Sequence, residues 1–253
     1  MKTSEIETTL DKFLGGKLTI EQPKKGYRAG IDPVLLAASV NAKSGQSILD
    51  LGCGVGVASL CLLKRIAGIR VIGIDLMPEL IKIAKQNARM NQLFMEAVCG
   101  NILKMPTEIR SFQFDHVIMN PPYFDRSKTT VSDNQLKETS NGEGLPLRCW
   151  VTSAASRVKD KGLVHIIFRT ERLPELLTAI PRSLGSLEVQ PFVPRSKRDS
   201  EIFILKARKG GNAAFQLASP IILHEGEIHK RDADSYTKKI ASILRCGAAL
   251  KED

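Results

Sequence analysis

The chain has 253 residues, 43% of them hydrophobic, and this length suits one α/β domain with a sizeable buried core. Its net charge of +10 indicates a polyanionic partner, while no apolar run could span a membrane and the N-terminus lacks a signal peptide, so we expect a cytoplasmic protein. The five cysteines are scattered without a C-x-x-C pair, so we expect neither a metal site nor a disulfide framework.

After a first stretch, 1–32, without clear periodicity, strands and helices alternate along the chain. This alternation predicts an α/β fold with a mostly parallel sheet covered by helices on both faces. We expect strands at 47–51, 70–75, 95–99, 114–119, 162–168, 187–193 and 201–208. The expected helices lie at 33–42, 57–67, 78–91, 144–159, 171–183 and 233–246.

A glycine-rich turn follows the first predicted strand and opens a helix. Gly52, Gly54 and Gly56 lack Cβ atoms, so the backbone there can turn tightly and approach a ligand closely. The next strand ends at Asp75, at a distance typical of an acid that binds ribose hydroxyls. Val57 stands where a dinucleotide fingerprint needs glycine, and no Gly-Lys-Ser/Thr follows. The pattern therefore predicts a site for a nucleoside cofactor without phosphates.

The tetrapeptide Asn120-Pro121-Pro122-Tyr123 directly follows the predicted strand 114–119. Two prolines stop further sheet pairing, and ligands of open α/β sheets bind beyond the carboxyl ends of the strands. An amide, a carbonyl freed from the sheet and an aromatic ring would then face one crevice. Such groups suit a planar substrate with an NH2 group.

Together, the glycine turn, Asp75 and residues 120–123 resemble the class I S-adenosylmethionine-dependent methyltransferases, in particular those that methylate amide or exocyclic amine nitrogens. The N-terminal segments 13–16, 22–23 and 26–38 narrow the resemblance. They are similar to the bacterial tRNA (adenine-N6)-methyltransferase family, which modifies valine tRNA beside the anticodon. The resemblance runs from Phe13 to Thr237.

The resemblance implies a Rossmann-like sheet of seven strands with one antiparallel strand near the C-terminal edge. Residues 187–193 and 201–208 fit the hairpin that this strand needs. We expect a single domain over 1–253, with an N-terminal extension at 1–45, a core at 46–210 and a C-terminal extension at 211–253. S-adenosylmethionine is the implied cofactor and tRNA the implied partner, and we expect a monomer.

The resemblance also suggests how the cofactor is held. Asp75 would accept from the ribose hydroxyls, backbone at 52–54 would lie against the methionine part, and the Asn101 oxygen would accept from the adenine amine. Arg28 and Asp32 would flank the site, or they would only form a salt bridge and a helix cap. The full expected set is Arg28, Asp32, Asp50, Gly52, Cys53, Gly54, Gly56, Asp75, Leu76, Asn101, Ile102 and Asn120.

The expected catalytic residues are Asn120, Pro121, Pro122 and Tyr123. The Asn120 side-chain oxygen and the Pro121 carbonyl would accept the two N–H groups of the target amine, and Tyr123 would stack on the base. We assign no general base, and we interpret His116 and His165 as structural strand residues.

Contacts to the substrate are expected from basic residues outside the core motifs, namely Lys24, Lys25, Arg28, Arg195, Lys197 and Arg198. Phosphate contacts from such residues bind without reading sequence, and the alternative is a solvated basic rim. The polar stretch 124–143 is interpreted as a substrate-facing lid, with a plain connection as the alternative.

Other functions are compatible with the same motifs. A protein glutamine N5-methyltransferase of the release-factor type would also need an activated amide nitrogen, but such enzymes usually carry a separate N-terminal helical domain. A DNA adenine methyltransferase would need a DNA-reading domain, for which little chain remains. The last alternative is a catalytically silent RNA-binding module, against which the intact motifs argue.

Overall fold

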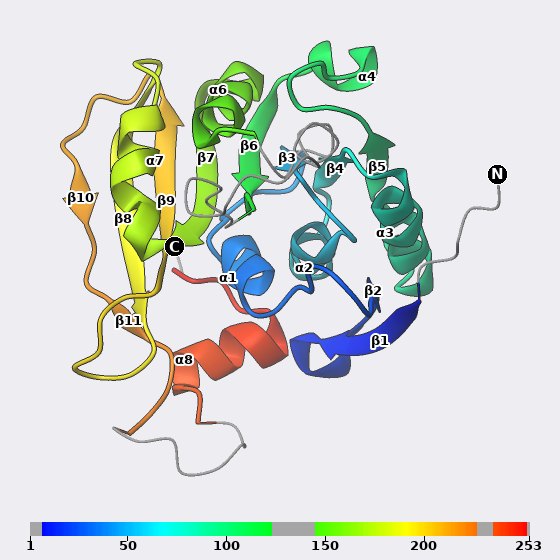
Figure 1. The fold of residues 1–253 in the computed structure, drawn as a ribbon, viewed down its shortest axis with the longest axis horizontal. Coiled ribbons are helices and arrows are strands. Elements are labelled where there is room, and N and C mark those ends of the chain that lie inside the picture. Colours follow the sequence, from blue (N-terminus) through cyan, green and yellow to red (C-terminus); the bar gives the residue numbers. More distant parts are fainter. Residues whose placement is uncertain (1–6, 123–144, 227–234, 252–253) are drawn as a thin grey trace, which may run out of the picture.

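A computed structural model describes residues 7–122, 145–226 and 235–251, and its centre is one twisted sheet (Figure 1). The strands follow the order β10-β8-β9-β7-β6-β3-β4-β5, and β11 pairs with β8 beside β10. Their bounds are β3 Ser47–Leu51, β4 Arg70–Asp75, β5 Glu96–Cys99, β6 Phe114–Met119, β7 Val158–Arg169, β8 Leu184–Val193, β9 Ile202–Lys209, β10 Gln216–Leu217 and β11 Ile221–Ile222.

The sheet is parallel except around β9. Strands β3 to β7 pair in parallel, whereas β9 lies antiparallel between β7 and β8. The predicted hairpin near the C-terminal edge is therefore confirmed. The short edge strands β10 and β11 were not predicted, because two-residue strands have no periodicity to read.

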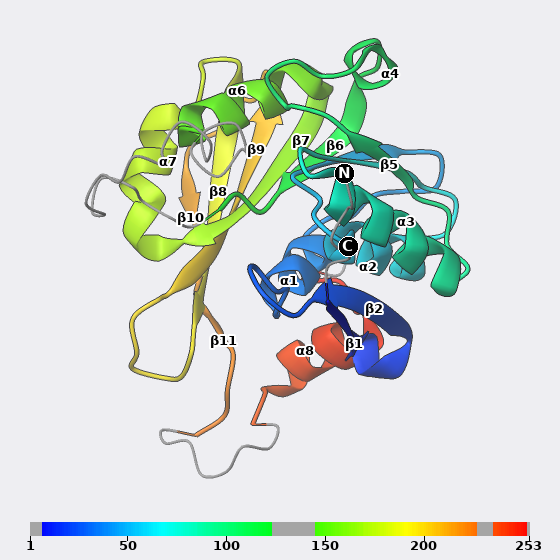
Figure 2. The same cartoon turned by 45° about the vertical axis from the view of Figure 1, so that its right-hand side comes forward.

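Helices cover both faces of the sheet, as predicted. Figure 2 shows α1 Asp32–Ala38, α2 Val57–Arg65 and α3 Pro78–Met90 on one side of it. The short α4 Thr107–Arg110, α6 Leu147–Arg157 and α7 Leu173–Ala179, which follows a 3₁₀ turn at Thr170–Arg172, lie on the other. Adjacent strand residues pack into different buried clusters, with Ile48 facing α1–α3 and Leu49 facing α6. This alternation follows from the two-residue repeat of a strand.

The N-terminal stretch, for which no strand was predicted, forms a hairpin. Strands β1 Thr8–Phe13 and β2 Leu18–Pro23 pair antiparallel around a 3₁₀ turn at Leu14–Gly16. The hairpin is anchored through two asparagines, Asn87 within α3 and Asn91 at its C-cap. Asn87 Oδ1 and Nδ2 bond the backbone N–H and carbonyl of Glu21, and Asn91 does the same for Thr19. Amide side chains thus replace a neighbouring strand.

The C-terminal helix lies beside this hairpin. Helix α8 Lys238–Ala241 continues into a π-helical turn, Ser242–Cys246, and Figures 1 and 2 both place this segment next to β1. A Cβ at Gly15 would lie 2.7 Å from the carbonyl oxygen of Arg245, so glycine permits the close approach. Leu14 and Ile243 belong to the same buried cluster as α1 and α2.

Some predictions stay open. The stretch 124–143 and Tyr123 lie outside the described residues. The domain boundaries at 45 and 210 stay a prediction. Among the described helices, none combines the length and the apolar character that a membrane crossing requires.

Candidate active site

Three neighbouring strands end at one edge of the sheet, and their last residues carry the predicted site. Strand β3 lies between β4 and β6, with Leu51 opposite both Ile74 and Met119. The glycine turn after β3 therefore starts between Asp75 at the end of β4 and Asn120 just beyond β6. The predicted convergence of these segments is confirmed.

Four N–H groups of the glycine turn, those of residues 52, 53, 54 and 56, are donated inside the protein. Those of Gly52 and Cys53 bond the Ile74 carbonyl at 2.8 and 3.0 Å, and that of Gly56 bonds the Cys53 carbonyl at 2.9 Å. The Gly54 N–H bonds the Asp75 carboxylate at 2.9 Å. A phosphate-binding loop instead presents free N–H groups to its anion. This turn therefore suits a ligand without phosphates.

The surroundings of Gly54 and Asp75 fit a nucleoside cofactor. Gly54 has φ +54°, and a Cβ on it would meet no atom within 4 Å, so space for a ligand remains beside the backbone. Asp75 is half-buried, and its two carboxylate oxygens accept the backbone N–H groups of Gly54 and Met77, with the Leu76 N–H also close to the carboxylate. Because a carboxylate offers about four acceptor positions, one remains for a ribose hydroxyl.

At position 52 glycine is required by packing and not by ligand access. A Cβ there would lie 2.7 Å from the indole ring of Trp150, which is buried on α6. The glycine is thus required by packing, and Trp150 fixes the start of the turn. Sequence analysis assigned Trp150 no role, because nothing local shows that α6 packs against the turn.

Asp50 lies inside the protein and does not face the ligand space. Its side chain is buried and accepts a 2.7 Å hydrogen bond from the Ser59 hydroxyl of α2. Burial, together with the nearby charge of Asp75, raises the pKa of Asp50 to about 7, although the hydrogen bond from Ser59 lowers it. The structure shows Asp50 joining β3 to α2, whereas sequence analysis placed it among the cofactor contacts.

Asn101 uses its side-chain oxygen within its own turn. Oδ1 accepts from the backbone N–H of Leu103 at 2.8 Å, which leaves one lone pair for the expected adenine contact. Ile102 is buried, and its carbonyl accepts from Ser153 of α6. Leu76 accepts at its carbonyl from the Cys99 thiol. These three residues border the ends of β4 and β5, as a cofactor-binding edge requires.

Asn120 contacts a residue to which sequence analysis gave no role. Its Nδ2 donates to the Tyr27 hydroxyl at 2.9 Å. Tyr27 is 63% exposed overall, yet its hydroxyl contacts Asn120 and feels the charge of Asp32. Burial of the hydroxyl and the Asp32 charge raise the pKa of Tyr27 to about 12, so the hydroxyl stays protonated at neutral pH.

Arg28 is engaged within the N-terminal segment. Its guanidinium donates to Thr9 Oγ1 at 2.8 Å, to the Pro23 carbonyl at 3.0 Å and to Asp11 at 2.6 Å. The salt bridge that was the alternative for Arg28 is therefore present. The helix cap considered for Asp32 is not: Ile31 is the N-cap of α1, and Asp32 lies in its first turn, where an acid is favourable.

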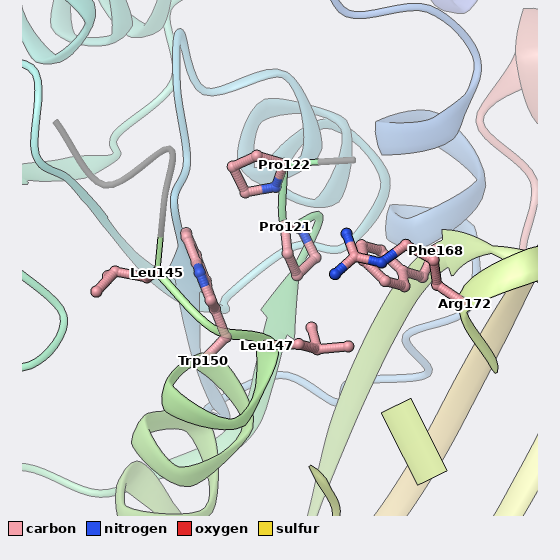
Figure 3. A pocket seen from close by; sticks show the side chains of 7 residues that line it. All are labelled: Pro121, Pro122, Leu145, Leu147, Trp150, Phe168 and Arg172. Carbon is pink, nitrogen blue, oxygen red and sulfur yellow. The ribbon is translucent and has the colours of Figure 1, made fainter. Parts of the chain in front are cut away.

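The prolines after Asn120 pack against an apolar support. Figure 3 shows Pro121 and Pro122 facing Trp150 and Leu147 of α6, with the Arg172 guanidinium stacked on the Phe168 ring nearby. The cavity between these side chains measures only about 20 Å³. The turn is thus backed by a packed wall, which restricts the Asn120 backbone.

The expected substrate contacts divide into two kinds. Lys24, Lys25, Lys197 and Arg198 are exposed, as phosphate contacts need to be. Arg195 is a correction: it is 9% exposed and donates to the carbonyls of Glu225 and Gly226 and to Ser235 Oγ. It therefore holds the chain that follows β11 and does not face solvent.

Comparisons with known proteins agree with this geometry. Residues 29–141 match the family model described as Methyltransferase small domain. A tRNA1(Val) (adenine(37)-N6)-methyltransferase of Porphyromonas gingivalis is 31% identical over 174 residues, which cover 66% of this chain and 68% of that protein. The chain belongs to this methyltransferase family. The methyltransferase is a class I enzyme, and S-adenosylmethionine is its cofactor.

One further protein and one solved structure are also similar to this methyltransferase. A protein of Methanocaldococcus jannaschii described as a candidate protein N5-glutamine methyltransferase is 27% identical over 116 residues, which cover 46% of this chain and 56% of that one. The solved structure of a predicted O-methyltransferase from Agrobacterium tumefaciens superposes with a TM-score of 0.69 at 23% identity, covering 87% of this chain and 98% of that one. The latter shows the shared Rossmann-like fold.

Proposed function

We propose that this enzyme methylates N6 of an adenine in tRNA, in the anticodon loop next to the anticodon. One observation carries the proposal: the Asn120 amide stands beyond β6, next to the glycine turn and Asp75 of the cofactor edge. The Porphyromonas gingivalis relative is named for adenine 37 of a valine tRNA, which supports both the base and the position.

The chemistry follows from the electronic structure of the target. The lone pair of an exocyclic adenine amine is delocalised into the ring, so the nitrogen is a poor nucleophile. Two acceptors for its N–H groups favour a pyramidal nitrogen with a localised lone pair. Asn120 Oδ1 and the Pro121 carbonyl are these acceptors in our proposal, with Pro122 fixing the turn and Tyr123 stacking on the base. Such help works only when the groups are fixed in advance, as the packed turn allows.

S-adenosylmethionine, when bound, supplies an electrophilic methyl group. Asp75 would hold the ribose, the open face of Gly54 would lie against the methionine part, and Asn101 would meet the adenine. The remaining contribution of these residues is to align donor and acceptor, which converts a bimolecular step into an effectively unimolecular one.

No general base is assigned, because the amine proton becomes acidic only after methyl transfer and can leave to water. The strand histidines are engaged elsewhere. His165 Nδ1 lies 3.1 Å from Ser39 Oγ, His165 Nε2 lies 3.2 Å from His116 Nδ1, and His116 Nε2 lies 3.3 Å from Gln46 Oε1. This buried chain crosses the sheet between β7 and β6 and supports the structural interpretation.

The RNA would be held by the exposed cations Lys24, Lys25, Lys197 and Arg198 through phosphate contacts. A base in the anticodon loop is already unpaired, so turning it toward Asn120 costs less than extrusion from a duplex. A cytoplasmic monomer acting on tRNA is part of the same proposal.

The test is methyl transfer from labelled S-adenosylmethionine to tRNA that lacks the modification, followed by nucleoside analysis and mapping of the site. We expect N6-methyladenosine beside the anticodon with the intact enzyme. We expect turnover to fall by about 1,000-fold or more with Asn120→Ala, while cofactor affinity stays within about twofold. Near-normal turnover by Asn120→Ala would refute the mechanism.

A protein glutamine is the second candidate, favoured by the Methanocaldococcus jannaschii likeness. An amide nitrogen needs the same activation, so Asn120 would serve it equally. Label in a release factor and none in tRNA would support this candidate. Cofactor binding with no transfer to either substrate would indicate an RNA-binding module without catalysis.

A further inference from the structure

The contact between Tyr27 and Asn120 joins two parts of the chain that are far apart in sequence. Asn120 follows β6 in the core, whereas Tyr27 lies in the connection between β2 and α1. The 2.9 Å hydrogen bond runs from Asn120 Nδ2 to the Tyr27 hydroxyl. A tyrosine that is 63% exposed thus turns its hydroxyl to the amide on which the proposed chemistry depends.

The connection that carries Tyr27 is clamped to the hairpin directly after Tyr27, at Arg28 and Ala29. Arg28 bonds Thr9 and Asp11 of β1 and the Pro23 carbonyl of β2. The Ala29 N–H donates to Gln22 Oε1 at 2.8 Å, and Gln22 Nε2 donates to Asp11 Oδ2 at 2.8 Å. These bonds fix where the Tyr27 hydroxyl can reach.

The hairpin that supports this clamp is itself fixed to the cofactor edge. Asn87 is fully buried on α3 and bonds β2 through Glu21. Its Nδ2 also donates to the carbonyl of Val55, within the glycine turn, at 3.0 Å. The glycine turn, the hairpin and Tyr27 therefore hold a set position relative to one another.

We propose that Tyr27 is a positioning residue that holds the Asn120 amide with its nitrogen toward Tyr27 and its oxygen toward the target amine. This role rests on the proposed function, since it concerns the acceptor that activates that amine. A primary amide has two nearly isosteric ends. Turned the other way, its NH2 group would face the N–H groups of the substrate, donor against donor. The Tyr27 hydroxyl can donate as well as accept, but the negative charge of Asp32 nearby favours its hydrogen on that side, which leaves the oxygen to accept from the Asn120 NH2 group and so selects the useful orientation.

The experiment compares Tyr27→Phe, which keeps the ring and removes the hydroxyl, with the wild type in tRNA methylation. We expect kcat to fall about 10- to 100-fold, with KM for tRNA and the cofactor Kd within about twofold. The matched control is Tyr236→Phe, which removes the hydroxyl of a tyrosine that stacks on His224 and should leave kcat unaltered. An unchanged kcat in Tyr27→Phe, or a higher KM alone, would overturn the proposal.

A double-mutant cycle separates positioning from general damage. In the Asn120→Ala background, Tyr27→Phe should have no further effect, because the group that it orients is gone. If the activity losses of the two single variants multiply in the double variant, the positioning role is contradicted. If Asn120→Ala itself keeps full activity, or if the wild type yields no N6-methyladenosine, the proposed function has failed and the positioning role falls with it.

Two further measurements extend the test, and the first of them needs no tRNA. The side-chain 15N amide signal of Asn120, identified by its loss in Asn120→Ala, should shift in Tyr27→Phe and not in Tyr236→Phe. Arg28→Ala, which releases the clamp, should lower kcat in the same direction. Its control, Arg70→Ala, breaks a comparable Arg–Glu96 pair at the start of β4 and should not. An unmoved amide signal would count against the contact in solution.

Discussion

The indole ring of Trp150 occupies the space in which a side chain on Gly52 would lie, because a Cβ on Gly52 would be only 2.7 Å from the ring. Gly52 also has φ +69°, a conformation that side chains rarely adopt. Gly54, two residues further, combines φ +54° with open space. Two glycines of one turn therefore serve different purposes, packing in the first case and ligand access in the second.

Gly52→Ala should lower the free energy of unfolding by about 2–4 kcal/mol, because overpacking adds to backbone strain. Gly54→Ala should cost only about 1 kcal/mol of strain but raise the cofactor Kd by about tenfold or more. Urea unfolding and calorimetric titration of S-adenosylmethionine measure the two effects. The assignment would be wrong if the two variants behaved alike.

Asp75→Asn should raise the cofactor Kd by about tenfold or more, since a charged acceptor for ribose hydroxyls is lost. A suitable control is Asp115→Asn at the start of β6, another strand carboxylate, which accepts from Ser47 and pairs with Lys159 at 2.9 Å. That change should affect stability and leave cofactor binding alone. Equal losses of affinity would argue against a ribose contact at Asp75.

The buried histidine chain should make the fold sensitive to acid. Burial lowers the pKa of His116 from 6.5 to about 4, and burial together with the neighbouring His116 lowers that of His165 well below 6.5. Both are neutral when folded, and the unfolded chain takes up protons first. The contribution of His116 to stability is thus complete above pH 6.5 and is lost as the pH falls toward 4, and the contribution of His165 is lost in the same direction.

For His116 alone the loss reaches about 3 kcal/mol. Urea unfolding over this pH range measures it, and His116→Gln should flatten the dependence. A pH profile that is identical in the variant would show that His116 does not titrate with folding.

The contribution of Asp50 to stability should depend on pH in the opposite direction to that of the histidines. Its pKa rises from 3.8 to about 7 on folding, chiefly through burial, so the folded state resists its ionisation. Stability from this group is present below pH 3.8 and is lost as the pH rises to about 7. Asp50→Asn, which can still accept from Ser59, should therefore stabilise the cofactor-free protein above neutral pH by up to about 4 kcal/mol. Thermal unfolding of the two proteins above neutral pH tests this, and a less stable variant would contradict it.

Substitutions at Arg195 and at Lys197 should have different effects, the first on the stability of the fold and the second on RNA binding. Arg195→Ala removes a buried guanidinium that donates to Glu225, Gly226 and Ser235, and should destabilise the fold by about 2–3 kcal/mol. Lys197→Ala should leave stability unchanged and reduce the salt dependence of tRNA binding by about one charge. Filter binding at several salt concentrations, beside thermal unfolding, distinguishes the two. If the Arg195→Ala variant is stable but binds RNA more weakly, Arg195 contacts the substrate as first expected from the sequence.

The sequence by itself determined the central strands and what stands at their ends. The predicted ranges 47–51, 70–75 and 114–119 match β3, β4 and β6, because each is an apolar run that stops at a glycine, an acid or a proline. Such signals are local, so the sequence alone could place Asp75 and Asn120 at the same edge of the sheet, where the parallel strands end.

Only the tertiary structure decided the contacts between segments far apart in the chain. The β1–β2 hairpin is held by Asn87 of α3 and by Asn91 at the C-cap of that helix, and neither residue carries a strand pattern. The burial of Arg195 and the contact of Tyr27 with Asn120 likewise depend on which elements pack together. Local propensity fixes where strands begin and end, whereas partners across the fold are fixed by long-range packing that no single stretch of sequence encodes.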